Sequence, residues 1–300
     1  MKLLLKKITD EIEFIDFIGN SEIEIKNLIQ LNIKNTDKSN LFWCNDKNLP
    51  NISELQTGTV IVSNNFDRNT VNLNCNYLIV ENPRRAFQEI VKKFFYRNEQ
   101  NVISSSAKIH NSVKTGKNVF IGENVIIERD CTIGNNSKIN HNTVVFKDTQ
   151  IGNNVVIGAN NTIGGIGFGY EKNKNGHFEL IPHIGNVIIE DNAEIGNNTC
   201  VDRAVLGSTI LKQNCKIDNL VHIAHGVSVG ENSVVIANAM VAGSVTIGKN
   251  VWVAPSASIL NQLTIEDNSM VGMAANVVKK VNEKEIVAGN PAKFIKKIPE

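Results

Sequence analysis

The sequence predicts a mainly β protein, in which a left-handed parallel β-helix of hexapeptide repeats follows a small N-terminal α/β domain. Three observations lead to this prediction. A β-branched or aliphatic residue recurs at every sixth position over most of residues 104–280, and Gly and Asn stand between these positions. The first hundred residues lack the repeat but show short strand and helix patterns. We expect domains at 1–103 and 104–280, with a short C-terminal tail over 281–300.

The N-terminal segment combines three apolar runs with one amphipathic stretch. The runs at 39–46, 59–64 and 76–81 are rich in Val, Ile, Leu and aromatic residues and predict short strands. Residues 81–95 predict a helix, because Asn82 suits the N-cap and Pro83 the first turn. One face of this helix gathers the apolar side chains of Ala86, Ile90, Val91, Phe94 and Phe95.

A six-residue period dominates the rest of the chain, and twenty-five positions follow it. This period does not fit an amphipathic helix or an isolated strand. It fits a short strand joined to a tight turn. Three such units make one triangular coil of about 18 residues, whose strands stack about 4.8 Å apart. We expect Gly and Asn to supply positive φ at the corners. The periodic positions run from Ile109 to Ile163, from Ile189 to Val201 and from Leu211 to Val277.

Two interruptions break the period. Residues 165–186 contain turn formers and aromatic residues, which predicts a loop that leaves the coil. Long excursions in repeat proteins gather on a functional face, so we expect this loop to be functional rather than decorative. The second interruption is a slip of the period near residues 202–210.

The composition restricts the classes of partner and the compartment. Because 31 basic residues face 30 acidic ones, net charge gives no case for nucleic acid or an anionic membrane surface. The first ten residues hold too short an apolar run for a signal-peptide core or a membrane span. The five cysteines show no CxxC spacing and leave one unpaired, which favours a reduced, cytoplasmic protein without a membrane segment.

The repeat alone is compatible with three classes of function. A structural or ice-binding solenoid would show a ladder of identical exposed Thr, and none is present. A trimeric metal-dependent hydratase would need three imidazole ligands, but His222 and His225 are three apart and would face opposite ways on a strand. We therefore expect no metal. The third class is acyl transfer, in which a lone histidine between two coils acts as general base.

Several motifs then point to one family. They are GFGY at 167–170, IPHIG at 181–185, the block 186–203, KIDN at 216–219 and IAHG at 223–226. Together with LFWCNDKN at 41–48 and NPRRAF at 82–87, they resemble the UDP-3-O-acylglucosamine N-acyltransferase family of lipid A biosynthesis. The resemblance implies a homotrimer that acylates a UDP-amino sugar from an acyl thioester, without a bound cofactor.

The resemblance implies roles for residues around the proposed base. His225 would take the proton from the attacking amine, which suits a neutral imidazole. The backbone N–H of Gly243, one coil further on, would face the developing oxyanion, although an ordinary corner glycine is an equal alternative. Asp218 and Asn219 would line the sugar pocket or serve as corners, and Asp218 would be able to orient an imidazole. His222 stands where the family has glutamine and would form a wall or a hydrogen bond.

Further binding residues follow from the same resemblance. Phe42 would stack on uracil and Asn45 would read it, with a buried core phenylalanine as the competing interpretation of Phe42. The excursion would shape the substrate pocket through Phe168, Tyr170 and His183.

Three substitutions depart from the family pattern. Gly226 replaces an asparagine directly after the base, Gln262 replaces a histidine two coils on, and Asn48 replaces a tyrosine that encloses uracil. Gln262 would still be able to hydrogen-bond the pantetheine or acyl group.

We expect no counterpart here of the C-terminal helical extension by which the family contacts acyl carrier protein. Gly289 and Lys293 instead resemble the end of coenzyme A-dependent hexapeptide transferases, near the phosphates of the cofactor, although a solvated tail is also possible. Two donors are therefore predicted as alternatives. The main resemblance implies an acyl carrier protein thioester, and the C-terminal tail implies an acyl-coenzyme A. The alternative function is an acyl-coenzyme A-dependent N-acyltransferase of a nucleotide-linked amino sugar for surface polysaccharide, with a non-enzymatic solenoid as a distant third.

Overall fold

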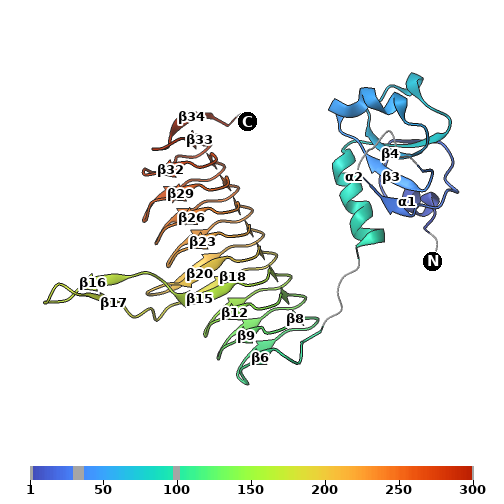
Figure 1. The fold of residues 1–300 in the computed structure, drawn as a ribbon. Helices are drawn as coiled ribbons and strands as arrows, with labels where there is room; N and C mark the ends of the chain where they lie inside the picture. The colour runs from blue at the N-terminus through green and yellow to red at the C-terminus, as the bar shows by residue number, and fades with distance from the viewer. Residues whose placement is uncertain (1–2, 30–36, 97–101, 299–300) are drawn as a thin grey trace. The chain divides into compact units, whose positions relative to one another are not determined.

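The structure, a computed structural model, describes residues 3–29, 37–96 and 102–298. The chain forms two compact units, residues 1–99 and 100–300 (Figure 1). Across these described ranges, no helix has both the length and the apolar character to cross a membrane.

The N-terminal unit is built on a five-stranded sheet with strand order β1-β5-β4-β3-β2. Strands β2 to β5 run parallel, and β1 pairs with β5 in the antiparallel sense. The three predicted apolar runs form β3, β4 and β5, so the interpretation of this segment as strands is confirmed. The strands are β1 (Asp16–Ile18), β2 (Asn27–Leu28), β3 (Asn40–Trp43), β4 (Gly58–Ser63) and β5 (Cys75–Val80).

Helices pack on this sheet and close two apolar clusters. In one cluster, Leu5 of α1 and Ile90 of α2 pack with side chains of the sheet strands. In the other cluster, Leu55 and Phe66 pack with the remaining buried side chains of the same strands. The Asn82 side chain accepts a hydrogen bond from the Arg85 N–H, which confirms the predicted N-cap. The α-helix ends earlier than predicted and continues as a π turn. The helices are α1 (Leu5–Glu11), η1 (Asp46–Glu54), η2 (Arg68–Thr70), α2 (Pro83–Ile90) and η3 (Val91–Phe95).

The second unit is the predicted left-handed β-helix, with three parallel sheets as the faces of a prism (Figure 1). The first face contains β6 (Lys108–Ile109), β9 (Ile126–Ile127), β12 (Val144–Val145), β15 (Thr162–Ile166), β20 (Cys200–Arg203), β23 (His222–Ile223), β26 (Met240–Val241), β29 (Ser258–Ile259) and β32 (Asn276–Val277).

The second face contains β7 (Lys114–Thr115), β10 (Thr132–Ile133), β13 (Gln150–Ile151), β18 (Asn186–Ile189), β21 (Ser208–Leu211), β24 (Ser228–Val229), β27 (Thr246–Ile247) and β30 (Thr264–Ile265). The third face contains β8 (Phe120–Ile121), β11 (Lys138–Ile139), β14 (Val156–Ile157), β19 (Glu194–Ile195), β22 (Lys216–Ile217), β25 (Val234–Val235), β28 (Trp252–Val253), β31 (Met270–Val271), β33 (Glu285–Ala288) and β34 (Lys293–Lys297).

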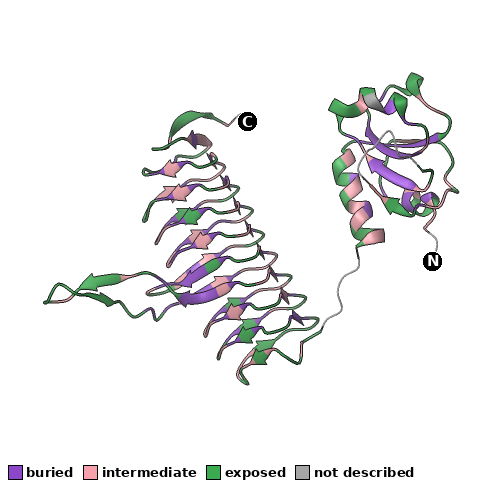
Figure 2. Cartoon of the chain, viewed as in Figure 1, coloured by how far each residue is buried: buried purple, intermediate pink, exposed green. Residues whose placement is uncertain are grey.

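The periodic residues of the repeat form the core of the prism. Ile223 pairs in register with Val201 on the preceding coil and with Val241 on the next, and all three side chains are buried. The same column continues through almost every coil, so each aliphatic side chain packs on its equivalent about 4.8 Å away. In Figure 2 buried strand positions therefore recur up the stack, beside exposed or half-buried neighbours.

Glycine and asparagine have different roles at the corners, although the sequence predicted positive φ for both. Asn136 and Asn154, the last residues of IGNN turns, have φ of 58° and 54°. Gly134 does not have positive φ, but a Cβ there would lie 2.4 Å from the carbonyl carbon of Gly152. Asparagine therefore supplies the left-handed backbone, while glycine lets adjacent coils approach closely.

The interruption at 165–186 leaves the prism, as predicted. The chain departs after β15 and forms an antiparallel hairpin of β16 (Tyr170–Lys172) and β17 (Phe178–Leu180), which projects from the stack in Figure 1. It then re-enters the coil at β18. The excursion and the nearby turn carry exposed apolar side chains at Ile166, Phe168, Phe178, Ile184 and Leu206.

The C-terminal segment is more ordered than the tail set apart in the sequence analysis. Strand β33 extends the third face, with Ile286 paired to Met270, and β34 folds back antiparallel to it. The hairpin thus pairs with the exposed edge of the last coil on this face.

Candidate active site

His225 lies at the corner that follows β23. Ile223 anchors this corner in the core, and the turn at His225 and Gly226 directs the chain into β24. The His225 side chain is half-buried. Its imidazole lies against Gly243 on the next coil, because a Cβ on Gly243 would be 2.7 Å from Cε1 and 2.8 Å from Nε2. Only glycine at this position leaves space for the ring.

His141 occupies the same turn position two residues after a core isoleucine, and it provides a contrast. Its Nδ1 accepts a hydrogen bond of 2.8 Å from the Glu123 N–H, so its ring binds the preceding coil. The ring of His225 faces the next coil instead and hydrogen-bonds to no other described residue. Of the two, only His225 has both ring nitrogens available for chemistry.

His183, from the excursion, lies beside His225. Its Nδ1 is 2.7 Å from the carbonyl oxygen of Ile181. A carbonyl only accepts, so Nδ1 carries the proton. The side chain is only 7% exposed, and Nε2 is buried without a hydrogen-bond partner among the described residues. The two rings meet edge-on, with 5.5 Å between their centroids and 84° between their planes.

The glycines of the GFGY motif cover both rings. A Cβ on Gly167 would lie 3.0 Å from Cβ of His225 and 3.2 Å from Nε2 of His183, and one on Gly169 would lie 3.0 Å from Cε1 of His183. Phe168 between them is 85% exposed, and its ring centroid is 4.8 Å from that of Tyr170. The structure therefore brings His225, Gly243, His183 and the excursion together.

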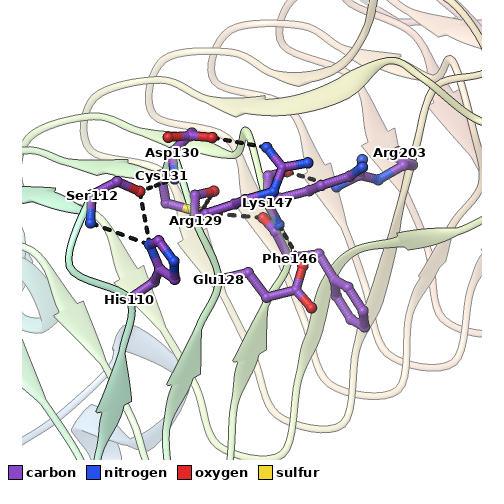
Figure 3. Close-up of polar contacts among 9 residues, drawn as sticks. All are labelled: His110, Ser112, Glu128, Arg129, Asp130, Cys131, Phe146, Lys147 and Arg203. Atoms are coloured by element: carbon purple, nitrogen blue, oxygen red, sulfur yellow. Dashed lines mark hydrogen bonds and ion pairs between the residues drawn. The ribbon is translucent and has the colours of Figure 1, made fainter.

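Arg203 binds the backbone where the excursion begins, and Figure 3 shows its contact with Lys147. The Arg203 side chain is 2% exposed, and it donates to the carbonyl oxygens of Gly164 at 2.7 Å and Lys147 at 2.6 Å. The Lys147 N–H in turn donates to the Glu128 carboxylate at 3.0 Å. The sequence analysis did not assign Arg203 a role, although a charged pair at 202–203, where the period slips, was a visible signal.

Asp202 and His222 form a second pair near His225. Nε2 of His222 lies 3.5 Å from an Asp202 oxygen. Burial raises the pKa of Asp202 to about 6, although the charge of His183 opposes the shift. Burial lowers the pKa of His222. The pKa of His225 is lowered by burial first and then by the charges of His183 and His222, which keeps His225 neutral near pH 7 and able to act as a base.

The backbone around Gly243 suits an oxyanion. The Ser244 N–H donates to the carbonyl oxygen of His225, and the Gln262 N–H donates to that of Gly243, both at 2.9 Å. The Gly243 N–H itself donates to no other described residue. It is therefore an unused donor beside the imidazole. Gln262 is exposed and lies in the column of Gly226, so it presents its amide to solvent near the same corner.

Asp218 and Asn219 lie at the other end of β23, at the corner that precedes it. The Asp218 carboxylate accepts the N–H groups of Asn219 at 2.7 Å and Ala237 at 3.1 Å. The Asn219 side chain accepts the Asn197 N–H at 2.6 Å. Within one chain these contacts bind neighbouring coils, and the Asp218 carboxylate makes no hydrogen bond to the His225 ring.

The two residues assigned to uracil differ in exposure. The Phe42 ring is fully buried, and a Cβ on Gly58 would lie 2.6 Å from its Cε2. A ring inside the core offers no face to a base, so its position matches the competing interpretation as a core residue. Asn45 is exposed, and its side-chain oxygen caps η1 by accepting the Asn48 N–H at 3.2 Å. Its amide nitrogen remains available for a ligand.

The C-terminal hairpin carries the residues assigned to the donor. Gly289 has φ of 98° at the turn that joins β33 to β34, and Lys293 opens β34 with an exposed side chain. Lys297 pairs with Glu285 at 3.5 Å. Among the residues that the structure describes, no group of three or more His, Cys, Asp or Glu side chains is able to hold a metal ion.

Comparison with protein families supports a transferase fold. Residues 106–141 and 130–165 match the family model described as bacterial transferase hexapeptide (six repeats). Residues 186–224 match the model described as hexapeptide repeat of succinyl-transferase. Both matches lie within the β-helix, and the second ends beside His225.

Comparison with curated proteins gives relatives that share one name. A UDP-3-O-acylglucosamine N-acyltransferase from Campylobacter lari is 44% identical over an alignment of 251 residues, and the match covers 79% of this chain and 77% of that protein. The protein of the same name from Helicobacter hepaticus is 43% identical over 208 residues, 66% of this chain and 64% of that one.

Comparison with solved structures supports the fold of the second unit. UDP-N-acetylglucosamine acyltransferase from Bacteroides fragilis superposes with a TM-score of 0.59 and 25% identity, over 65% of this chain and 74% of that one. The enzyme from Francisella novicida gives a TM-score of 0.61 and 23% identity, over 65% and 70%. At these identities the likeness concerns the β-helix fold.

Proposed function

The chain belongs to the family of UDP-3-O-acylglucosamine N-acyltransferases, and from this premise we propose that it transfers an acyl group from a thioester to the amino group of UDP-3-O-acylglucosamine in lipid A biosynthesis. The observation that carries this proposal is the environment of His225. Its half-buried ring makes no hydrogen bond to another described residue, lies against Gly243 and has a lowered pKa.

The reaction needs one base and one oxyanion donor. The amine nitrogen attacks the thioester carbonyl carbon, so a C–N bond forms and the C–S bond breaks. His225 takes the proton that the nitrogen loses and returns it to the departing thiolate sulfur. The unused Gly243 N–H stabilises the negative oxygen of the tetrahedral intermediate. His225 and Gly243 together need to move only one proton. This chemistry requires no bound cofactor.

The acceptor has a nucleotide part and a sugar part. In the N-terminal unit, the exposed Asn45 contributes the amide that reads the uracil. Asp218 and Asn219 lie at a different corner from His225. If both corners contact one sugar, they belong to adjacent copies, as in the homotrimer that the family resemblance implies. The exposed apolar side chains of the excursion supply surface for such contacts.

The donor is an acyl thioester, and we assign it to acyl carrier protein. The exposed lysines of β34, Lys293 and Lys296, suit an acidic carrier protein. They would also suit the phosphates of coenzyme A, and the hairpin around Gly289 favours this second candidate, an acyl-coenzyme A-dependent transferase that acts on another nucleotide-linked amino sugar. The five cysteines, all free, are consistent with the cytoplasm.

A donor–acceptor matrix tests the proposal. Acyl carrier protein and coenzyme A thioesters are offered against UDP-3-O-acylglucosamine and UDP-4-amino sugars, with the wild-type chain and with His225→Ala. We expect turnover with the carrier-protein donor and UDP-3-O-acylglucosamine, and a loss of about 10²–10⁴ in kcat for His225→Ala. Wild-type rates in the variant would contradict the base assignment, and turnover of coenzyme A thioesters with a 4-amino sugar alone would favour the second candidate.

A further inference from the structure

We propose that His183 is a positioning residue for His225: its fixed, buried ring holds the imidazole of the base edge-on, with the Cε1–Nε2 edge of that imidazole against Gly243. The inference rests on the proposed function, because it assumes that His225 is the base. It assigns to one excursion residue the orientation of the group that moves the proton.

The base needs support from outside its own coil. Its ring nitrogens bind no other described residue, and Gly226, which follows it, has no side chain that could hold the ring. Asp218 is engaged by backbone N–H groups at another corner. The contacts that remain for the ring are packing contacts with Gly243, Gly167 and His183.

His183 is itself held firmly enough to act as such a support. The hydrogen bond from Nδ1–H to Ile181 fixes its rotation. Gly167 and Gly169 pass close to the ring, because an added Cβ would lie 3.2 Å from Nε2 and 3.0 Å from Cε1, respectively. A histidine side chain rotates about two torsion angles. When one ring nitrogen is hydrogen-bonded and the ring is buried, both angles are held and the ring has one fixed orientation. The edge-on contact, 5.5 Å between centroids, transmits this rigidity to the base.

The unpartnered Nε2 of His183 is explained by this arrangement. It is buried beside Gly167, which also faces Cβ and Cδ2 of His225, whereas Gly243 faces Cε1 and Nε2 of His225. With Nδ1–H committed to Ile181, Nε2 of the neutral ring carries only a lone pair. In that form His183 places no proton donor against the base, whereas a protonated His183 places a positive charge there that lowers the pKa of His225. The other titratable groups that interact with these rings are His222 and Asp202.

The test uses two substitutions of His183 and a matched control in the full-length protein. His183→Gln keeps a polar group but removes the ring, His183→Phe keeps a ring but removes both nitrogens, and His177→Gln changes an exposed histidine of the same excursion. We measure kcat, the KM for the sugar, and the pH dependence of kcat/KM. Thermal unfolding of each variant checks that it is folded.

We expect His183→Gln to lower kcat about tenfold with the sugar KM within about twofold, because a displaced base loses alignment without losing substrate contacts. The acid limb of its pH profile should move to higher pH, because the charge of His183 contributes to the lowered pKa of His225. His183→Phe should retain more of kcat than His183→Gln, and His177→Gln should match wild type.

Three results would overturn the inference: an unchanged kcat in His183→Gln, a rise in KM alone, or a larger kcat loss in His183→Phe than in His183→Gln. The last two would make His183 a substrate-binding residue instead. Failure of this inference is separable from failure of the proposed function, because His225→Ala in the same assay reports on the base itself.

Discussion

His225 and His141 occupy the same place in the six-residue repeat, yet their surroundings give them different roles. His141 has a backbone N–H of the preceding coil as its partner and becomes part of a corner. His225 has a glycine on the next coil and a buried histidine at its side. Residue type and register are identical, so the difference lies in the neighbours that folding brings to each ring.

Gly243→Ala should abolish most activity while leaving the fold intact. The new methyl group would lie 2.7 Å from Cε1 of His225, so the ring must move away from the proposed oxyanion donor. The backbone of Gly243 lies outside the positive-φ region, so alanine adds no backbone strain there. We expect kcat/KM to fall at least about a hundredfold, with the midpoint of thermal unfolding nearly unchanged. Activity close to wild type would show that the His225–Gly243 contact is dispensable.

Asp202→Asn should stabilise the protein at neutral pH and not at low pH. The folded pKa of Asp202 is raised to about 6, so the native state binds a proton that the unfolded chain has already released. The stability that this group contributes is therefore present below about pH 4 and lost as pH rises through 6. Removing the carboxylate should gain up to about 3 kcal/mol of unfolding free energy at pH 7.5.

Urea unfolding at pH 7.5 and pH 4 measures this effect, and Asp130→Asn is its control. The pKa of Asp130 is lowered, chiefly by hydrogen bonds from Arg129 and Ser112. Its contribution is present at neutral pH and lost on acidification, so the pH dependence should have the opposite sign. A gain for Asp202→Asn that is equal at both pH values would contradict the assignment of a buried charge.

At the scale of elements, the excursion at 165–186 is hydrogen-bonded to the β-helix where it begins, and its hairpin end is exposed. Arg203 fastens the base through two backbone carbonyl oxygens, while the hairpin β16–β17 has exposed side chains throughout. The residues near His225 lie closest to the fastened end. Positioning residues are thereby kept rigid, and the tip is left for contacts with partners or substrates.

Arg203→Met should loosen the base of the excursion. The substitution leaves the carbonyl groups of Gly164 and Lys147 without their charged donor, which costs about 2–4 kcal/mol of unfolding free energy. Amide hydrogen exchange should rise over residues 165–186 more than in the rest of the β-helix. The control is Arg129→Gln, an exposed ion pair, which should change stability by less than about 1 kcal/mol. Equal exchange in both variants would show that Arg203 does not hold the excursion.

At the scale of the whole molecule, the chain has two independent sources of stability. The N-terminal unit closes its own apolar clusters around Leu41 and Phe42, while the β-helix has a continuous column of aliphatic side chains. The coils of the β-helix contact mainly their neighbours, so its stability is a sum over stacked coils. Among the described residues, no buried residue belongs to both cores.

Calorimetry should therefore resolve two unfolding transitions. Because the units have separate cores, Phe42→Ala should lower the midpoint of one transition, and Ile223→Ala that of the other. Each loss of a buried side chain should cost about 2–5 kcal/mol in its own unit. A single transition in which the calorimetric and van't Hoff enthalpies agree would show that the units unfold as one.

The β-helix was predictable because its signal is repeated and local. The side chain of Ile223 is predicted to point inward because residues six positions away are also aliphatic. A departure from the pattern at one position does not change this prediction, because many other positions follow it. The N-terminal strands and the Asn82 cap were predictable for the same reason, since their residues act within one element. The interpretation of Phe42 shows the limit, because a strand pattern does not say which face is covered.

The sequence by itself determined the hexapeptide period, the coil length and the place of the excursion, because these depend on residue type and on spacing along the chain. The candidate base came from the family resemblance of the IAHG motif. The tertiary structure decided which side chains share a site. Stacking of coils places Gly243 against His225, and the return of the excursion brings His183 to the same ring, across separations that carry no periodic signal. The same stacking uses Asp218 to bind coils together and buries Asp202. Side-chain direction at a corner depends on which atoms fill the adjacent coil, and that is settled only when the coils are in contact.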